Sequence, residues 1–283
     1  MQNAKHKRQI FKYALYKRLS QASLVVSLLS LLALVIFIVI RGLPYVNFQL
    51  IFGDYGAEPT IKPALVGTLY LVLISVLISA PIGIGSAIFL TEYTNTKSKI
   101  IRWVRVATET LAGIPSIVYG IFGYLVFVVA LGFKYSLLGG GITLAIMILP
   151  LIVRSTEENL LAVPKSFREG SFALGASKVR TIFTVVLPCA VSGIVTSLIL
   201  AIGRVISESA VLILTIGMVV DKMPQGVSSP GTSLALDVYY FGSFGYPEQA
   251  SATALVLLIL VLAINIIATV IGKKLNKFSG GRL

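Results

Sequence analysis

Six long apolar stretches dominate the chain and limit the folds that it can adopt. They cover about residues 20–40, 64–90, 108–131, 141–161, 189–216 and 250–272. A helix needs roughly 20 mainly apolar residues to cross the hydrocarbon core of a bilayer. With 56% hydrophobic residues among 283, the chain is also more apolar than soluble domains usually are. The sequence therefore predicts an all-α integral membrane protein with six transmembrane helices.

The first stretch is predicted to stay in the protein as a span. Its apolar run from Ala22 to Ile40 is longer than the roughly 7–15 residues of a signal-peptide core, and no small-residue cleavage site follows it. The chain accordingly divides into a basic tail (residues 1–19), a transmembrane domain (20–272, with a core of five helices over about 64–272) and a second basic tail (273–283).

The net charge of +13 is distributed unevenly along the chain. Nineteen of the 24 lysine and arginine residues lie in two kinds of segment: the two tails, and the regions in or beside the loops that follow the second and fourth stretches. The positive-inside rule then places these segments, and both termini, in the cytoplasm. This topology explains the basic charge without nucleic acid, which we do not expect as a partner.

The cytoplasmic loop over residues 162–188 carries the most informative local motif. Ser166 and Glu169 have the spacing of a capping box, which predicts that a helix starts there. Gly175 can take the left-handed conformation that ends a helix, and Ser177 can cap a second helix that runs toward Pro188. The loop is thus predicted to be a charged helix-turn-helix that docks a cytoplasmic partner.

The second stretch has small residues at every fourth position, namely Ser75, Ser79, Gly83 and Ala87. Small residues at this spacing let helices approach closely in lipid. Pro81 lies in the same stretch and is predicted to kink the helix, because it removes a backbone donor and crowds the preceding turn. A static packing seam and a hinge both fit this pattern.

The third stretch contains helix-interrupting residues around Gly113, Pro115, Ser116, Tyr119 and Gly120. Such interruptions persist at membrane depth only where protein or a water-filled cavity covers the freed backbone groups. The segment is therefore predicted to face the interior, either as a lining or mobile part of a pathway or as a packing element.

Arg204 and Glu208 are charged residues inside the fifth stretch, four positions apart. At this spacing they are predicted to share one helical face and to pair. A guanidinium inside a membrane has to face protein or water, and its planar fork matches phosphate or carboxylate oxygens. The pair is either a structural ion pair or an anion passage in which Glu208 weakens the binding enough to permit release.

Several kinds of chemistry are excluded by residues that the sequence lacks. Cys189 is the only cysteine and His6 the only histidine, so no intrachain disulfide, cysteine metal cluster, histidine zinc cluster or histidine-dependent triad can form. There is also no G-x-x-x-x-G-K-[ST] motif for nucleotide phosphates. If ATP drives this protein, another subunit hydrolyses it.

The helix-turn-helix resembles the coupling-loop signature of ABC importer permeases, which reads EAA, three residues, G, nine residues, I-x-L-P. Gly170 and Ser171 replace the alanines and Val185 replaces the isoleucine, but the spacing is intact. The resemblance implies a type I ABC importer permease fold whose cytoplasmic loop docks on an ATPase. The docking residues that it implies are Ser166, Glu169, Gly170, Ser171, Gly175, Leu187 and Pro188.

Three segments, residues 111–123, 155–178 and 201–217, are similar to phosphate-specific permeases of the PstA type. The family's arginine and glutamate associated with phosphate passage map onto Arg204 and Glu208, and Ser209 keeps the hydroxyl group of a threonine found in many relatives. The resemblance implies a heterodimer with a PstC-type permease, two PstB-type ATPase subunits and an external phosphate-binding protein. It also implies inorganic phosphate as cargo, a multi-pass position in the lipid bilayer of a bacterial or archaeal cell membrane, no cofactor and no catalytic residue in this chain.

Other functions fit parts of the pattern. A PstC-type paralogue, or a permease for molybdate or sulfate, would share the coupling loop. A secondary transporter would also use charges in the membrane, but it has no need for that loop. A structural scaffold would explain the small-residue seam but not Arg204.

Overall fold

The computed structural model of the protein describes residues 2–56, 58–94 and 98–278. These residues form helices joined by loops, and no β-strand occurs among them. The longer helices are α1 (Gln2–Gly42), α3 (Lys62–Ile88), α4 (Lys99–Ala112), α5 (Ser116–Gly123), α6 (Leu137–Leu161), α9 (Leu187–Ile206), α11 (Leu234–Ser243) and α12 (Pro247–Phe278). The shorter ones are α2 (Phe48–Phe52), α7 (Lys165–Ala173), α8 (Lys178–Thr181), α10 (Ala210–Thr215), the 3₁₀ turn η1 (Leu43–Tyr45) and the π-helical segments η2 (Phe89–Tyr93), η3 (Tyr124–Ala130) and η4 (Ile182–Val186). The predicted all-α class is confirmed, while residues 279–283 of the predicted basic tail lie outside the described residues.

Five helical segments in the described residues are long and apolar enough to cross a membrane. They are Lys12–Tyr45, Lys62–Tyr93, Leu137–Leu161, Lys178–Ile206 and Pro247–Lys274. A sixth span forms if Ile101–Ala112 and Ser116–Ala130 are counted together. The six predicted stretches therefore all correspond to apolar helix, with the third interrupted before Ser116 and the fifth after Ile206.

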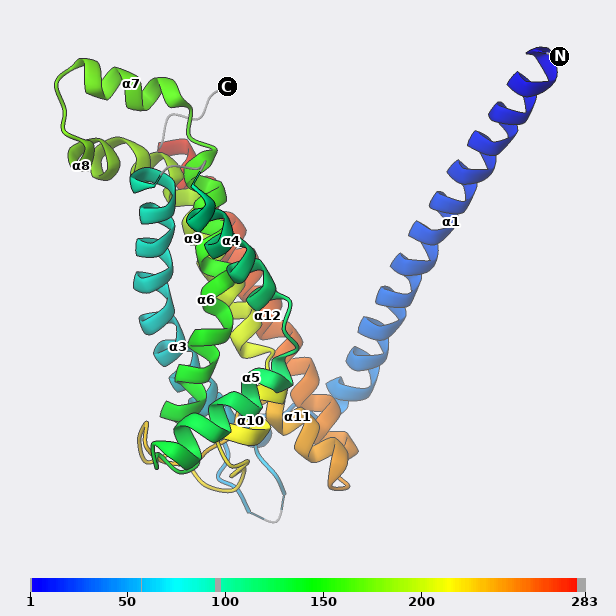
Figure 1. Cartoon of the computed structure of the whole chain (residues 1–283). Helices are drawn as coiled ribbons and strands as arrows, with labels where there is room; N and C mark the ends of the chain where they lie inside the picture. Colours follow the sequence, from blue (N-terminus) through cyan, green and yellow to red (C-terminus); the bar gives the residue numbers. More distant parts are fainter. Residues whose placement is uncertain (1, 57, 95–97, 279–283) are drawn as a thin grey trace.

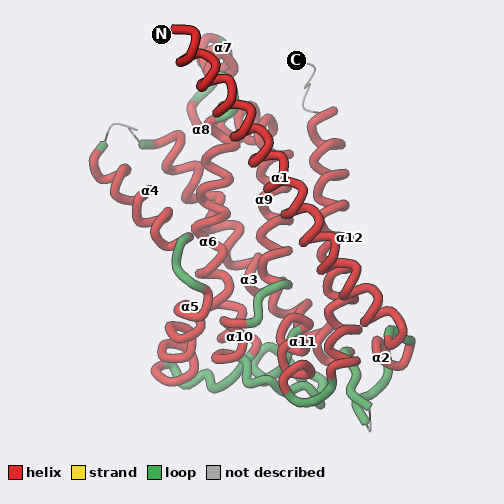
Figure 2. Tube along the Cα trace, turned by 90° about the vertical axis from the view of Figure 1, so that its right-hand side faces the viewer, coloured by secondary structure: helices red, strands yellow, loops and turns green. Residues whose placement is uncertain are grey.

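The predicted third span is not a single helix, because its two parts are bent by 96°. Gly113 ends α4, and Pro115 lies in an extended conformation directly before α5. A proline disfavours helical backbone in the residue before it and has no N–H to donate, so the helix stops at this point. Figure 2 shows the resulting loop between α4 and α5.

Helix α6 lies at the centre of the bundle and packs closely along α3. The small residues of α3 form the predicted seam, because Ser75, Ser79, Gly83 and Ala87 are all buried. A Cβ atom on Gly83 would lie 2.7 Å from a methyl carbon of Ile152 in α6, so the close approach depends on the missing side chain. Packing is thus confirmed for this seam, and α3 runs on through Pro81.

Helices α7 and α8 form the predicted helix-turn-helix, which projects from one end of the bundle (Figure 1). Gly175 has φ +80° between them, and the Ser177 hydroxyl accepts a hydrogen bond from the Arg180 amide at 3.3 Å. The predicted capping box is wrong, since Pro164 occupies the position before α7 and Ser166 lies within its first turn. Proline is tolerated at this position because the N–H that it lacks would have no partner within the helix.

Helix α1 diverges from the rest of the bundle and meets α12 only near its C-terminal end (Figure 1). At that point a Cβ on Gly42 would lie 2.5 Å from the Ser251 carbonyl oxygen. No residue in the most apolar 18-residue window of this span is buried against the rest of the described chain. Lipid or another subunit therefore has to cover α1.

Candidate functional site

Two helix breaks lie next to each other toward the end of the bundle opposite α7 and α8. One separates α4 from α5, and the other separates α9 from α10. Helices α5 and α10 pack together at Gly120, where an added Cβ would lie 3.1 Å from the Val211 Cα. The Tyr119 hydroxyl donates to the Leu111 carbonyl at 2.9 Å and so bridges the first break. The residues predicted in the third stretch are thereby brought close to those predicted in the fifth.

Arg204 lies in the last turn of α9, and its side chain is exposed. Tyr119 of α5 lies close enough to Arg204 for an electrostatic interaction between the two side chains. Among the described residues, no carboxylate lies within ion-pair distance of this guanidinium. An arginine exposed to lipid would be costly, so Arg204 has to face water or another subunit in the membrane.

Glu208 does not share a helical face with Arg204, and this prediction is wrong. Helix α9 ends at Ile206, and Glu208 and Ser209 are non-helical. The Glu208 carboxylate instead accepts a hydrogen bond from the Val211 amide at 3.3 Å, where α10 begins. The first amides of a helix have no partner within it, so a carboxylate there is stabilised by the N–H groups and the helix dipole. Arg204 is left available to another anion.

The outer surface of α7 and the turn after it is exposed. Helix α7 has no buried residue, and Glu169 and Gly170 are exposed. Leu174 is 90% exposed, and Phe167 and Phe172 are about half exposed. Such an apolar patch, with Glu169 beside it, suits contact with another protein.

Two of the other predicted docking residues, Ser171 and Leu187, make contacts inside this element or with the spans. The Ser171 hydroxyl forms a hydrogen bond with the Thr181 hydroxyl at 2.8 Å, which joins α7 to α8. Leu187 packs among buried residues of α3, α6 and α9, and Pro188 lies in the first turn of α9. Ser171 thus fixes α7 on α8, and Leu187 packs the end of the helix-turn-helix against the spans.

Arg168 is a functional candidate that the sequence patterns did not reveal. Its guanidinium forms an ion pair of 2.7 Å with Glu92 and donates to the carbonyls of Leu160 and Val163 at 2.9 and 2.8 Å. Glu92 is 76 positions away, so no local spacing could have predicted the contact.

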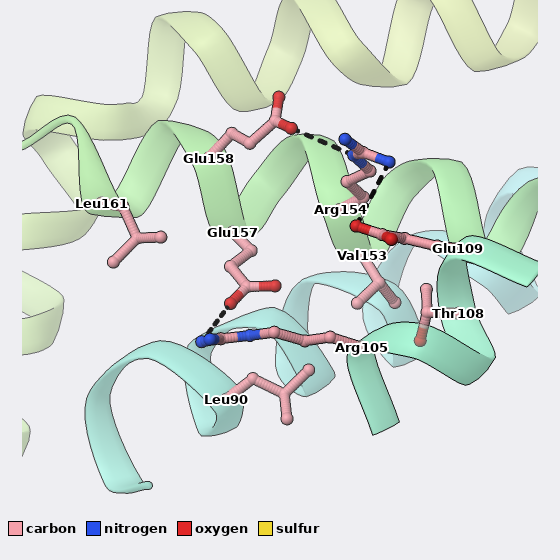
Figure 3. A pocket seen from close by; sticks show the side chains of 9 residues that line it. All are labelled: Leu90, Arg105, Thr108, Glu109, Val153, Arg154, Glu157, Glu158 and Leu161. Carbon is pink, nitrogen blue, oxygen red and sulfur yellow. Dashed lines mark hydrogen bonds and ion pairs between the residues drawn. The ribbon is translucent and has the colours of Figure 1, made fainter. Parts of the chain in front are cut away.

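A cluster of charged residues lies between α4 and α6 (Figure 3). Arg105 pairs with Glu157 at 2.6 Å, while Arg154 pairs with Glu109 at 3.5 Å and with Glu158 at 3.1 Å. These side chains line a cavity of about 210 Å³. Only the Arg154–Glu158 pair has a helical spacing that a sequence can indicate. No group of three or more Asp, Glu, His or Cys side chains in the described ranges could hold a metal ion.

Asp237 is a buried carboxyl group in α11, outside the spanning segments. One of its oxygens accepts a hydrogen bond from the Thr232 hydroxyl, and the other has no hydrogen-bond partner within the described residues. Burial raises the pKa of Asp237 to about 8, and the Thr232 hydrogen bond opposes this rise. The carboxyl group is thereby favoured in its neutral form.

The sequence model of binding-protein-dependent transport system inner membrane components matches residues 79–277. This range contains α4 to α10, hence both helix breaks, and the helix-turn-helix. The chain belongs to this family. It is a permease subunit of an ABC importer, a class whose members work with a second permease, ATPase subunits and a binding protein.

Named relatives match nearly the whole permease. It is 34% identical to the probable ABC transporter permease protein YqgI of Bacillus subtilis over 266 residues, covering 87% of this chain and 90% of that protein. It is 31% identical to the probable phosphate transport system permease protein PstA of Methanocaldococcus jannaschii, covering 93% and 95%. Among solved structures, the MetNI methionine ABC transporter in an inward-facing conformation superposes with a TM-score of 0.64 at 22% identity, covering 76% of the permease and 95% of that chain. The type I ABC importer permease fold is thus confirmed.

Proposed function

We propose that this permease is a membrane subunit of an ATP-driven inorganic phosphate importer. The observation that carries the proposal is the exposed Arg204, which lies beside two helix breaks and has no carboxylate partner among the described residues. A guanidinium offers a planar fork that fits phosphate oxygens, and freed backbone N–H groups at a break add further donors. Relatives named as phosphate transport system permeases support the same cargo.

In this proposal Arg204 lines the pathway that forms between the permease and a PstC-type partner. Gly113, Pro115, Ser116 and Ser209 lie at the two breaks and line or shape the pathway near it. The Glu208 carboxylate accepts a hydrogen bond from the Val211 amide and so orders the start of α10. Its negative charge weakens the attraction of Arg204 for an anion, but it does not occupy the guanidinium. Transport needs such weak and transient contacts, because a tightly held anion would not leave.

The proposed coupling uses the exposed surface of α7, on which a PstB-type ATPase subunit docks. The first turns of α1 and the last described turns of α12 lie at the same end of the molecule as α7 and α8 (Figure 1). These segments are rich in lysine and arginine, which supports a cytoplasmic position for this end and for both termini. An external phosphate-binding protein would then approach the opposite end.

The test is uptake of radiolabelled phosphate by the reconstituted complex of this permease, its partner permease and the ATPase, with the binding protein outside. Loss of a charge-assisted contact weakens binding by roughly 1.5–3 kcal/mol, so we expect Arg204→Ala to lower uptake about tenfold or more, and Arg204→Lys to lower it less. Arg41→Ala is the matched control, because Arg41 is also an exposed arginine in the last turn of a span.

Competition with unlabelled anions tests the cargo itself. Excess phosphate should abolish the labelled signal, while sulfate and molybdate should leave it unchanged. Uptake that is unchanged in Arg204→Ala would show that this residue has no role in passage. Stronger competition by sulfate or molybdate than by phosphate would assign another oxyanion.

A further inference from the structure

Two neighbouring residues at the end of η2, Glu92 and Tyr93, each contact a cation from a different helix of the helix-turn-helix. Arg168 of α7 contacts the Glu92 carboxylate with Nη2 at 2.7 Å and with Nε at 3.1 Å. Lys178, at the start of α8, lies over the Tyr93 ring with its Nζ 4.9 Å from the ring centre. We call these four residues the clasp.

The Arg168–Glu92 pair is shielded from water, since the two side chains are only 17% and 10% exposed. Arg168 also donates to the carbonyls of Leu160 and Val163, at the end of α6 and just after it. Such carbonyls have no partner within their own helix, so the guanidinium satisfies them while it pairs with Glu92. One side chain thereby joins α7, α6 and η2, which a lysine ammonium could not do with the same geometry.

The residues that receive these contacts lie on the π-helical segment η2, which continues α3. Single π-helical turns inside helices are rare and often occur at functional positions. From η2, α3 runs along α6 to the opposite end of the molecule, where the Leu234 amide donates to Thr68 at 3.0 Å. A displacement of η2 would thus reach both ends of the bundle through a closely packed helix.

We propose that the clasp transmits movement of α7 and α8 to α3, and that Arg168 and Glu92 are its positioning residues. This inference rests on the proposed function, because it takes α7 as the site where the ATPase docks. The exposed face of α7 meets the ATPase, and the clasp on its other side converts displacement of α7 into displacement of α3. Without the clasp, the ATPase would still bind and hydrolyse ATP, but less of the movement would reach the spans.

The experiment measures ATP hydrolysis and substrate uptake together in the reconstituted complex, with the binding protein loaded with whichever oxyanion supports uptake. The informative value is the number of anions imported per ATP hydrolysed. For Glu92→Gln and Arg168→Gln we expect hydrolysis to stay near the wild-type rate and this ratio to fall by about fivefold or more, the usual lower range of coupling between sites. Arg168→Lys, which keeps the charge and loses the fork, should be intermediate.

Asp54→Asn is the matched control, because it also removes a carboxylate that pairs with a cation on α3, here Lys62 at the opposite end of that helix. Its ratio should equal that of the wild type. Tyr93 supplies an independent test if an Arg168 or Glu92 variant fails to assemble. Tyr93→Phe keeps the ring under Lys178 and should retain coupling, whereas Tyr93→Leu should lower the ratio by about two- to fivefold.

A wild-type ratio in Glu92→Gln, Arg168→Gln and Tyr93→Leu would overturn the proposal. So would a parallel loss of hydrolysis and uptake at a constant ratio, which would mean that the clasp only maintains the docking surface. A wild-type complex that hydrolyses ATP and imports another oxyanion, but no phosphate, would contradict the proposed function and leave the ratio as a valid test of the clasp.

Discussion

Arg168 and Arg204 are both arginines set among apolar helices, but their surroundings differ. Arg168 has a carboxylate and two carbonyl oxygens as partners, and it is mostly buried. Arg204 is exposed, and the carboxylate nearest in sequence is engaged by a backbone amide. A guanidinium whose donors all have protein partners stabilises the fold, whereas one without a carboxylate partner at a helix break can bind a transported anion. The two residues therefore suit coupling and passage, respectively.

The turn between α7 and α8 depends on the backbone conformation of Gly175. Its φ is +80°, and an added Cβ would meet nothing within 4 Å. Gly175→Ala should therefore cost about 1–2 kcal/mol through backbone strain alone, and a bulky residue there should also abolish ATP-dependent transport. Gly170→Ala is the control, because that site is equally open but helical, and alanine there should stabilise by about 0.5–1 kcal/mol. Thermal unfolding in detergent measures both, and equal midpoints for the two variants would contradict this view of the turn.

Asp237 should make the stability of the permease depend on pH. Burial raises its pKa from an ordinary 3.8 to about 8, so the stability contributed by the neutral form is complete below pH 3.8 and is lost as the pH rises toward 8. The unfolding midpoint of the wild type should fall from pH 5 to pH 8. Asp237→Asn keeps an acceptor for Thr232 and removes the charge, so its midpoint should change less. The chain has one histidine, so few other side chains titrate in this range. Identical pH profiles would show that burial of Asp237 does not favour its neutral form.

At the residue scale, the sequence could predict only features with a local cause. Gly175 and Ser177 act on their own backbone and its neighbours, and both predictions are confirmed. The capping box failed because Pro164 takes the cap position and α7 begins at Lys165, so Ser166 already lies inside the helix. The Arg168–Glu92 pair depends on how three helices meet, which no spacing along the chain encodes.

At the scale of elements, hydrophobic length predicted the spans but not where two of them break. The density of glycine and proline in residues 113–123 indicated an interruption, although not its 96° bend. The break after α9 has no such signal, since Ser207–Glu208–Ser209 contains neither glycine nor proline. Helix α11 was not predicted either, although the Ser233 hydroxyl caps it by accepting from the Leu236 amide at 3.2 Å. Tertiary contacts, rather than local preference, set these boundaries.

The packing of α3 against the segment before α11 gives an element-scale prediction. A Cβ on Gly67 would lie 2.0 Å from the Thr232 carbonyl oxygen, which belongs to the backbone and cannot move alone. Gly67→Ala should therefore destabilise the permease by about 1–3 kcal/mol or more, as overpacked cores do. Gly85→Ala is the control on the same helix, because nothing lies within 4 Å of its added Cβ. An unfolding midpoint for Gly67→Ala that matches that of Gly85→Ala would show that these two segments do not pack this closely.

At the scale of the whole molecule, the permease is an incomplete unit. Helix α1 extends from the bundle with its apolar surface uncovered, α7 presents an apolar patch beyond the spans, and the Arg204 side chain is exposed. In the proposed function each of these surfaces has a neighbour: lipid or a second permease for α1, an ATPase for α7, and a shared aqueous pathway for Arg204. The composition alone could predict a membrane protein, and the coupling-loop signature could predict its class. The arrangement that joins these surfaces follows only from the fold.

The central claim is that this permease carries phosphate inward at the expense of ATP hydrolysed by its partners. The most direct measurement is accumulation of labelled phosphate in vesicles that contain the full complex, with ATP on the side of α7 and α8 and the binding protein on the other side. We predict accumulation that requires both ATP and the binding protein and that persists when ionophores abolish ion gradients. Accumulation that continues without ATP and disappears with the ionophores would contradict the account, because it would identify a transporter driven by an ion gradient.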